Sequence, residues 1–117
     1  MTELHALGAV ASLVAAGGLL LLSAAAGALD RGHQWVSRAA PVATAVFALQ
    51  AGIGLVVMVG GGAFGEGLHL LYGVALAVAV PLALTFASDA PQRARSWVLA
   101  VAALVSLVLV WRLYATG

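Results

Sequence analysis

The sequence predicts an all-α integral membrane protein, an up-down bundle of four transmembrane helices joined by short loops. Of its 117 residues, 64% are hydrophobic and only 8% are charged, too few to cover a separate soluble domain. The apolar residues form four runs, each about the 20 residues that a helix needs to cross a bilayer. The runs lack the period-two alternation of barrel strands, and only helices or closed barrels satisfy their backbone groups in lipid. We therefore expect a single transmembrane domain, residues 1–117.

The first helix is expected at about residues 4–29. Its start is not basic and its apolar run is long, which favours a membrane helix over a secretory signal peptide. Gly8, Ser12 and Ala16 form a stripe of small residues at a spacing of four. Such a stripe predicts that a neighbouring helix approaches closely.

The second helix is expected at about residues 39–59, with Pro41 in its first turn, where a missing N–H is tolerated. Gln50 lies near its centre, and a carboxamide at that depth must find a partner. Packing against another helix is favoured over contact with a ligand. A glycine-rich connection, residues 60–67, follows.

The third helix is expected at about residues 68–87 and the fourth at about 96–114. Pro81 interrupts the third run and predicts a kink there, because proline removes one backbone hydrogen bond. Pro91, in the connection between these two helices, suits a first helical residue.

The arginines predict the orientation of the chain. Arg31 and Arg38 lie in the first connection, and Arg93 and Arg95 lie in the third. Because connections rich in arginine stay on the cytoplasmic side, both termini and the middle connection should lie outside. We expect an N-out and C-out protein of the inner (cell) membrane of a bacterium or archaeon.

Two histidines near one end of the bundle predict a cofactor site. His5 and His69 enter the membrane from the outer face at matching depth, on the first and third helices. Gly8 follows His5 by three residues, and Tyr72 and Gly73 follow His69 by three and four. A histidine with a glycine one turn away suits haem, because the ring needs a groove free of side chains beside its axial ligand. We expect haem b, ligated by both histidines.

Other polar residues at this end could serve the same site or a simpler one. Arg112 is available to pair with haem propionates, and Glu3 and Glu66 to orient an imidazole. These carboxylates and the two histidines could instead bind zinc, copper or iron, although their spacing matches no metal motif. The plain alternative is that His5 and His69 are interfacial residues, hydrogen-bonded to the glutamates.

Several function classes are disfavoured. The chain has no cysteine, hence no disulfide, thiolate ligand, c-type haem or iron–sulfur cluster of its own. No acidic residue lies deep in a helix, which removes the usual basis of a proton-coupled carrier. Ser12, Ser23 and Ser106 have no histidine at their depth, so no nucleophile and base pair is expected, and His33 is expected to be solvated and without a role. The scattered arginines form no face for nucleic acid.

The function predicted first is a small b-type cytochrome that holds haem between the first and third helices near the outer face. It would transfer electrons to a protein partner or a quinone and catalyse no bond-making reaction. The alternative is a cofactor-free accessory subunit of a larger membrane complex, or of a homo-oligomer. A third alternative is a small transporter that uses Gln50 and the kink at Pro81.

Overall fold

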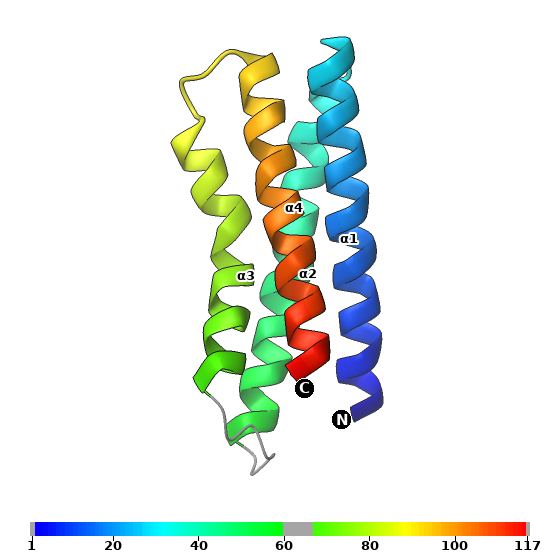
Figure 1. The fold of residues 1–117 in the computed structure, drawn as a ribbon, viewed down its shortest axis with the longest axis vertical. Helices are drawn as coiled ribbons and strands as arrows, with labels where there is room; N and C mark the ends of the chain where they lie inside the picture. Colours follow the sequence, from blue (N-terminus) through cyan, green and yellow to red (C-terminus); the bar gives the residue numbers. More distant parts are fainter. Residues whose placement is uncertain (1, 60–66, 117) are drawn as a thin grey trace.

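The structure, a computed structural model, describes residues 2–59 and 67–116. These residues form four helices and no strand: α1 (Thr2–Leu29), α2 (His33–Val59), α3 (Gly67–Phe86) and α4 (Gln92–Thr116) (Figure 1). Three of them contain stretches long and apolar enough to cross a membrane. These stretches are Ala6–Leu29, His33–Val56 and Gln92–Ala115.

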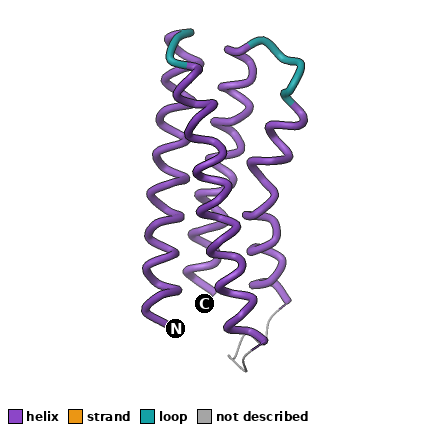
Figure 2. The backbone as a smooth tube through the Cα atoms, turned by 180° about the vertical axis from the view of Figure 1, so that it is seen from behind, coloured by secondary structure: helices purple, strands orange, loops and turns teal. Residues whose placement is uncertain are grey.

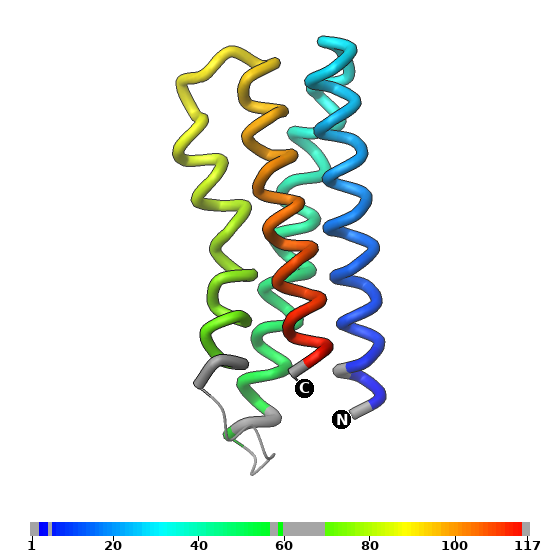
Figure 3. The backbone as a smooth tube through the Cα atoms, viewed as in Figure 1, coloured from blue at the N-terminus to red at the C-terminus, as the bar shows by residue number. Residues whose placement is uncertain are grey.

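The helices lie side by side in an elongated molecule of 47 × 23 × 19 Å. Each helix packs against its neighbour in the chain, and α4 returns to pack against α1 (Figure 3). Across the middle, the described parts of α2 and α4 also meet, whereas those of α1 and α3 do not. The two ends of the chain lie at the same end of the molecule (Figure 1). We call it the terminal end.

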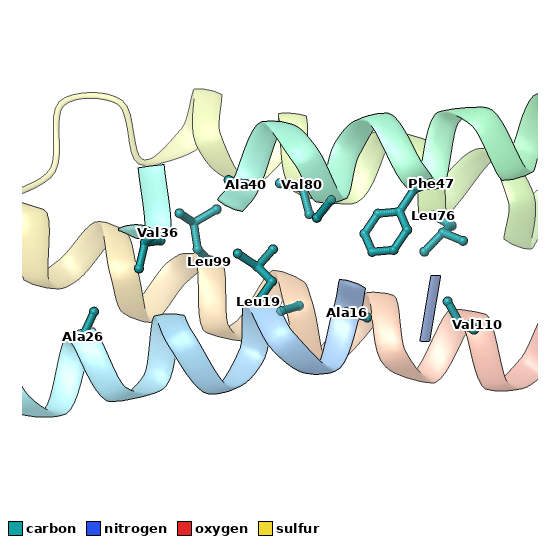
Figure 4. Packing of buried hydrophobic residues seen from close by; sticks show 12 residues of the cluster. Ala16, Leu19, Ala26, Val36, Ala40, Phe47, Leu76, Val80, Leu99 and Val110 are labelled. Atoms are coloured by element: carbon teal, nitrogen blue, oxygen red, sulfur yellow. The ribbon is translucent and has the colours of Figure 1, made fainter. Parts of the chain in front are cut away.

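Each helix turns one seam of buried residues inward, at alternating spacings of mostly three and four. This spacing is the heptad pattern of helices that pack at a small crossing angle. The side chains pack along the length of the molecule, with Phe47 of α2 beside Leu76 of α3 (Figure 4). The seam residues are Ser12, Ala16, Leu19, Ser23 and Ala26 in α1, Val36, Ala40, Ala43, Phe47 and Gln50 in α2, Leu76 and Val80 in α3, and Ser96, Leu99, Ala103, Ser106 and Val110 in α4.

The seams of α1 and α4 consist mostly of alanine and serine, so these two helices can approach closely. Ser12 and Ala16 of the predicted small-residue stripe are buried in this seam. Near the other end of α1, Gly27 faces the indole ring of Trp97, and a Cβ on Gly27 would lie 2.7 Å from the nearest ring atom.

Two described connections lie at the end opposite the termini, which we call the loop end (Figure 2). At the end of α1, Asp30 and Gly32 adopt positive φ angles of 51° and 79° and turn the chain. Arg93 Nε donates a hydrogen bond of 2.8 Å to the carbonyl oxygen of Gly27. This bond satisfies a carbonyl that the end of α1 would otherwise leave without an intrahelical partner.

Two helices begin earlier than the sequence predicts. α2 begins at His33, not at about residue 39, so Pro41 lies inside the helix and not in its first turn. α4 begins at Gln92, not at about residue 96. In α2 the polar segment before residue 39 forms the first turns, and His33 bonds to Asp30 and Ser96. In α4 the segment before residue 96 is helical as well, and the Arg95 N–H donates a hydrogen bond of 2.9 Å to the carbonyl oxygen of Pro91.

Candidate functional site

The predicted haem ligands lie in the first turns of α1 and α3, at the terminal end. His5 lies seven residues before Ser12 of the α1 seam, and His69 lies seven residues before Leu76 of the α3 seam. Their side chains, like all of Glu66, lie outside the described part of the chain.

α1 and α3 occupy opposite corners of the bundle. With about 8–10 Å between neighbouring helix axes, opposite corners are roughly 11–14 Å apart. Because α2 and α4 meet across the other diagonal, a planar ring between α1 and α3 fits only where the bundle opens at an end. The first turns of α1 and α3 lie at the terminal end.

The space beside Gly8 is filled. A Cβ on Gly8 would overlap with Oε1 of Gln50 and would lie 2.7 Å from its Cδ. Gln50 is 8% exposed, and its carboxamide packs across the α1–α2 contact. This glycine therefore admits a neighbouring side chain, and the predicted groove beside Gly8 is not open in the structure.

Gly73 differs from Gly8, because no described atom lies within 4 Å of the position its Cβ would take. One residue before it, Tyr72 receives a hydrogen bond of 3.3 Å from Arg112 Nη2. The guanidinium carbon of Arg112 also lies 5.6 Å from the centre of the Tyr72 ring. The structure thus brings two predicted site residues, Tyr72 and Arg112, together across α3 and α4, next to the open flank of Gly73.

A second polar cluster, at the loop end, was not predicted. His33 Nε2 lies 2.9 Å from Oδ1 of Asp30, and His33 Nδ1 lies 2.7 Å from Oγ of Ser96. The His33 side chain is 11% exposed and Ser96 is 2% exposed, so the prediction that His33 is solvated is wrong. Asp30 and His33 are three residues apart at the α1–α2 turn, a visible signal, but nothing in the sequence points to Ser96, 63 positions away.

A cavity of about 130 Å³ adjoins this cluster between α2, α3 and α4. His33 and Ser96 line it together with polar Ser37, Gln92 and Arg95. Its remaining lining is apolar: Val36, Pro41, Leu84 and Leu99.

Arg95 is held in place beside the cavity. Its Nη2 donates hydrogen bonds to the carbonyl oxygens of Ser88 (2.8 Å) and Ala90 (3.5 Å), and its Nε to that of Ala87 (3.3 Å). These acceptors follow the end of α3, so the guanidinium ties α4 to the α3–α4 connection.

No group of three or more His, Asp or Glu side chains that could hold a metal ion occurs in the described part of the chain. The predicted metal alternative depends on His5, Glu66 and His69, whose side chains are not described. No protein-family model, curated protein or solved structure matches the chain.

Proposed function

We propose that all four helices cross the bilayer of a bacterial or archaeal inner membrane as an up-down bundle, with both termini outside. Three helices meet the length and apolarity that a span needs. The 20 residues of α3 extend about 30 Å at roughly 1.5 Å per residue, the thickness of a hydrocarbon core. The outward faces also expose large apolar side chains, such as Leu21 (73%) and Phe86 (86%), which suit lipid as their surroundings.

The orientation is tested by cysteine labelling, because the chain has no cysteine of its own. We expect Thr2→Cys and Ala115→Cys to react with an impermeant thiol reagent from outside the cell, and Gln34→Cys to react only after lysis. External labelling at Gln34 without labelling at Thr2 would reverse the topology.

For this membrane bundle we propose the function of a small b-type cytochrome, with His5 and His69 as axial ligands of haem b. The observation that supports the proposal is that His5 and His69 lie in the first turns of α1 and α3, two diagonally opposed helices, at the same end of the molecule. A bound haem supplies one-electron chemistry, and the chain would pass electrons to a protein partner or a quinone.

The residues around the two histidines fit this cofactor in part. Arg112, steadied by Tyr72, offers a cation to a propionate one turn from His69. Gly73 keeps a flank of α3 free of side chains. The Gly8 flank is taken by Gln50, so the ring would lie on the α3 side of the site.

The decisive experiment is an absorption spectrum of the purified full chain. We expect a low-spin haem spectrum that is lost or becomes high-spin in His5→Ala and in His69→Ala and is unchanged in His33→Ala. We also expect Gly73→Leu to lower haem loading, since it places a side chain on the open flank. The matched control is Gly18→Leu, which likewise meets open space but lies far from the histidines. A colourless protein, or unchanged spectra in both histidine variants, would refute the proposal.

The second candidate is a cofactor-free accessory subunit of a larger membrane complex or of a homo-oligomer. The observation that favours it is the Gln50 carboxamide seated on Gly8, because it closes one of the two flanks that haem was expected to use. This candidate predicts a colourless protein that co-purifies with a partner or with a second copy of itself.

A further inference from the structure

The cluster at the loop end has the connectivity of a nucleophile, a base and an orienting carboxylate. Ser96 Oγ is 2.7 Å from one nitrogen of His33, and Asp30 Oδ1 is 2.9 Å from the other. Exposure falls along the series, from 57% for the Asp30 side chain to 11% for that of His33 and 2% for Ser96. The chain of contacts thus leads from solvent to a buried hydroxyl.

The carboxylate decides where the imidazole proton lies. An ionised carboxylate only accepts hydrogen bonds, so His33 Nε2 must carry the hydrogen that Asp30 receives. In the neutral ring, Nδ1 is then an acceptor, and Ser96 donates its hydroxyl hydrogen to it. This is the arrangement in which a histidine serves as general base for a serine.

The neighbouring cavity gives Ser96 room for a substrate. Its volume of about 130 Å³ is close to that of roughly 150 Å³ cavities that take up benzene, so it fits a small apolar acyl group. Leu84 and Leu99 supply apolar lining, while Gln92 and Arg95 line the same space with hydrogen-bond donors. The hydrogen bonds of Arg95 to carbonyl oxygens are made by Nε and Nη2, and Nη1 has no hydrogen-bond acceptor among the described residues.

We propose that Ser96 is a nucleophile that accepts the acyl group of a small apolar ester, with His33 as its base and Asp30 as a positioning residue. Ser96 Oγ attacks the ester carbonyl carbon while its proton moves to His33 Nδ1, and the developing oxyanion is stabilised by Gln92 and Arg95. His33 then returns this proton to the departing alkoxide as the ester C–O bond breaks, leaving acyl-Ser96 and an alcohol.

Water completes the cycle. His33 takes a proton from a water molecule that attacks the acyl carbon, the bond to Ser96 Oγ breaks, and the same proton restores the hydroxyl. The products are one carboxylic acid and one alcohol, and no electrons are exchanged. This activity goes beyond the proposed electron transfer and needs neither haem nor the terminal end, so the two proposals succeed or fail separately.

The test uses the full chain in lipid nanodiscs and a fluorophosphonate, a reagent that phosphonylates activated serines. We expect one adduct per chain, mapped by mass spectrometry to Ser96, together with hydrolysis of 4-nitrophenyl butyrate. Ser96→Ala should abolish both. The matched control is Ser106→Ala, which removes a buried hydroxyl from the same helix. That hydroxyl donates a hydrogen bond of 2.8 Å to the carbonyl oxygen of Ala102.

Wild-type chain that stays unmodified at excess reagent, or is modified at another residue, overturns the proposal without any variant. A purely structural role for the cluster would make Ser96→Ala less stable but leave the wild type unreactive.

Asp30→Asn separates positioning from folding, because asparagine also tolerates the positive φ of 51° at this site. We expect phosphonylation to slow by a factor on the order of 10² or more, with an unchanged circular dichroism spectrum. Labelling at the wild-type rate would remove Asp30 from the proposed site.

Discussion

The contact between Gly27 and Trp97 provides a quantitative test of the close α1–α4 packing. An ideal Cβ on Gly27 would lie 2.7, 2.8 and 2.9 Å from the Cε2, Cδ2 and Nε1 atoms of the indole. Non-bonded carbon atoms prefer about 3.5–4.0 Å, so in Gly27→Ala either the ring or the helix must move by roughly 1 Å. Overpacking of this kind destabilises a protein by about 1–3 kcal/mol.

Gly18→Ala on the same helix isolates that effect. Nothing lies within 4 Å of the position its Cβ would take. Both variants gain the helix propensity of alanine over glycine, about 1 kcal/mol, so it cancels when the two are compared. We expect Gly18→Ala to match or exceed the wild type in stability, and Gly27→Ala to be about 1–3 kcal/mol less stable than Gly18→Ala.

The assay is reversible unfolding in mixed detergent micelles, followed by circular dichroism. The double variant Gly27→Ala, Trp97→Ala removes the ring that the new methyl group meets, so the two changes should couple by an amount similar to the overlap energy. Equal stability of Gly27→Ala and Gly18→Ala, or purely additive effects in the double variant, would refute the close contact. Trp97 is 45% exposed, so displacement of its ring into the surroundings would place the result at the lower end of the range.

Three further predictions concern other contacts of the bundle. Gly8→Leu should destabilise the protein by about 1–3 kcal/mol through overlap with Gln50, and the added substitution Gln50→Ala should recover most of that loss in the same unfolding assay. Gly32→Ala forces a Cβ into a positive φ of 79° and should cost about 1 kcal/mol, whereas no loss would show that the turn can rearrange. Arg93→Met removes the donor to the Gly27 carbonyl, so amide hydrogen exchange in the last turn of α1 should accelerate about fivefold, equivalent to about 1 kcal/mol, while exchange near Gly8 stays unchanged.

The helical fold could be predicted because it follows from the length and apolar character of the four runs in the sequence. Long runs of Leu, Ala and Val leave few alternatives once backbone groups must be satisfied without water. The helix starts could not be predicted as well. Residues 33–38 contain four polar side chains and lie shortly before Pro41, which suits the first turn of a helix, so the helix was expected to begin after them. His33 nevertheless begins α2, because its side chain bonds both to the turn before it and to Ser96 on α4.

The candidate sites show the same division between local and tertiary information. Counting residues along each helix was enough to expect His69, Tyr72 and Arg112 at the same end of the bundle, because depth follows from position along a helix. The contact between Tyr72 and Arg112 was not predicted, since it depends on which faces of α3 and α4 meet. Gln50 fills the space beside Gly8 because one particular face of α2 turns toward α1. The rotation of α2 about its own axis cannot be obtained by counting residues along one helix. Ser96 was missed for a related reason, since its partner lies in a segment expected to be loop.

Polar residues occur in the seams at both ends of the bundle, Ser96 bonded to His33 at the loop end and Gln50 packed against Gly8 on the side of the terminal end. Gln50 occupies a seam position of α2, and His5 and His69 lie in the first turns of α1 and α3. Alanine or leucine would fill these positions without the penalty of about 1–3 kcal/mol that a buried polar group incurs when its hydrogen bonds are not made. Serine in a seam can limit this penalty by bonding to its own helix, as Ser106 does to Ala102, but the longer side chains of histidine and glutamine suit partners on other helices or on a ligand. At the terminal end, the seam position of Gln50 and the histidines of the first turns of α1 and α3 bring polar side chains to one end of the molecule. A haem would be ligated by polar side chains at this end, whereas a partner subunit would form interhelical hydrogen bonds with them. The absorption spectrum is therefore the measurement that separates the two proposed functions.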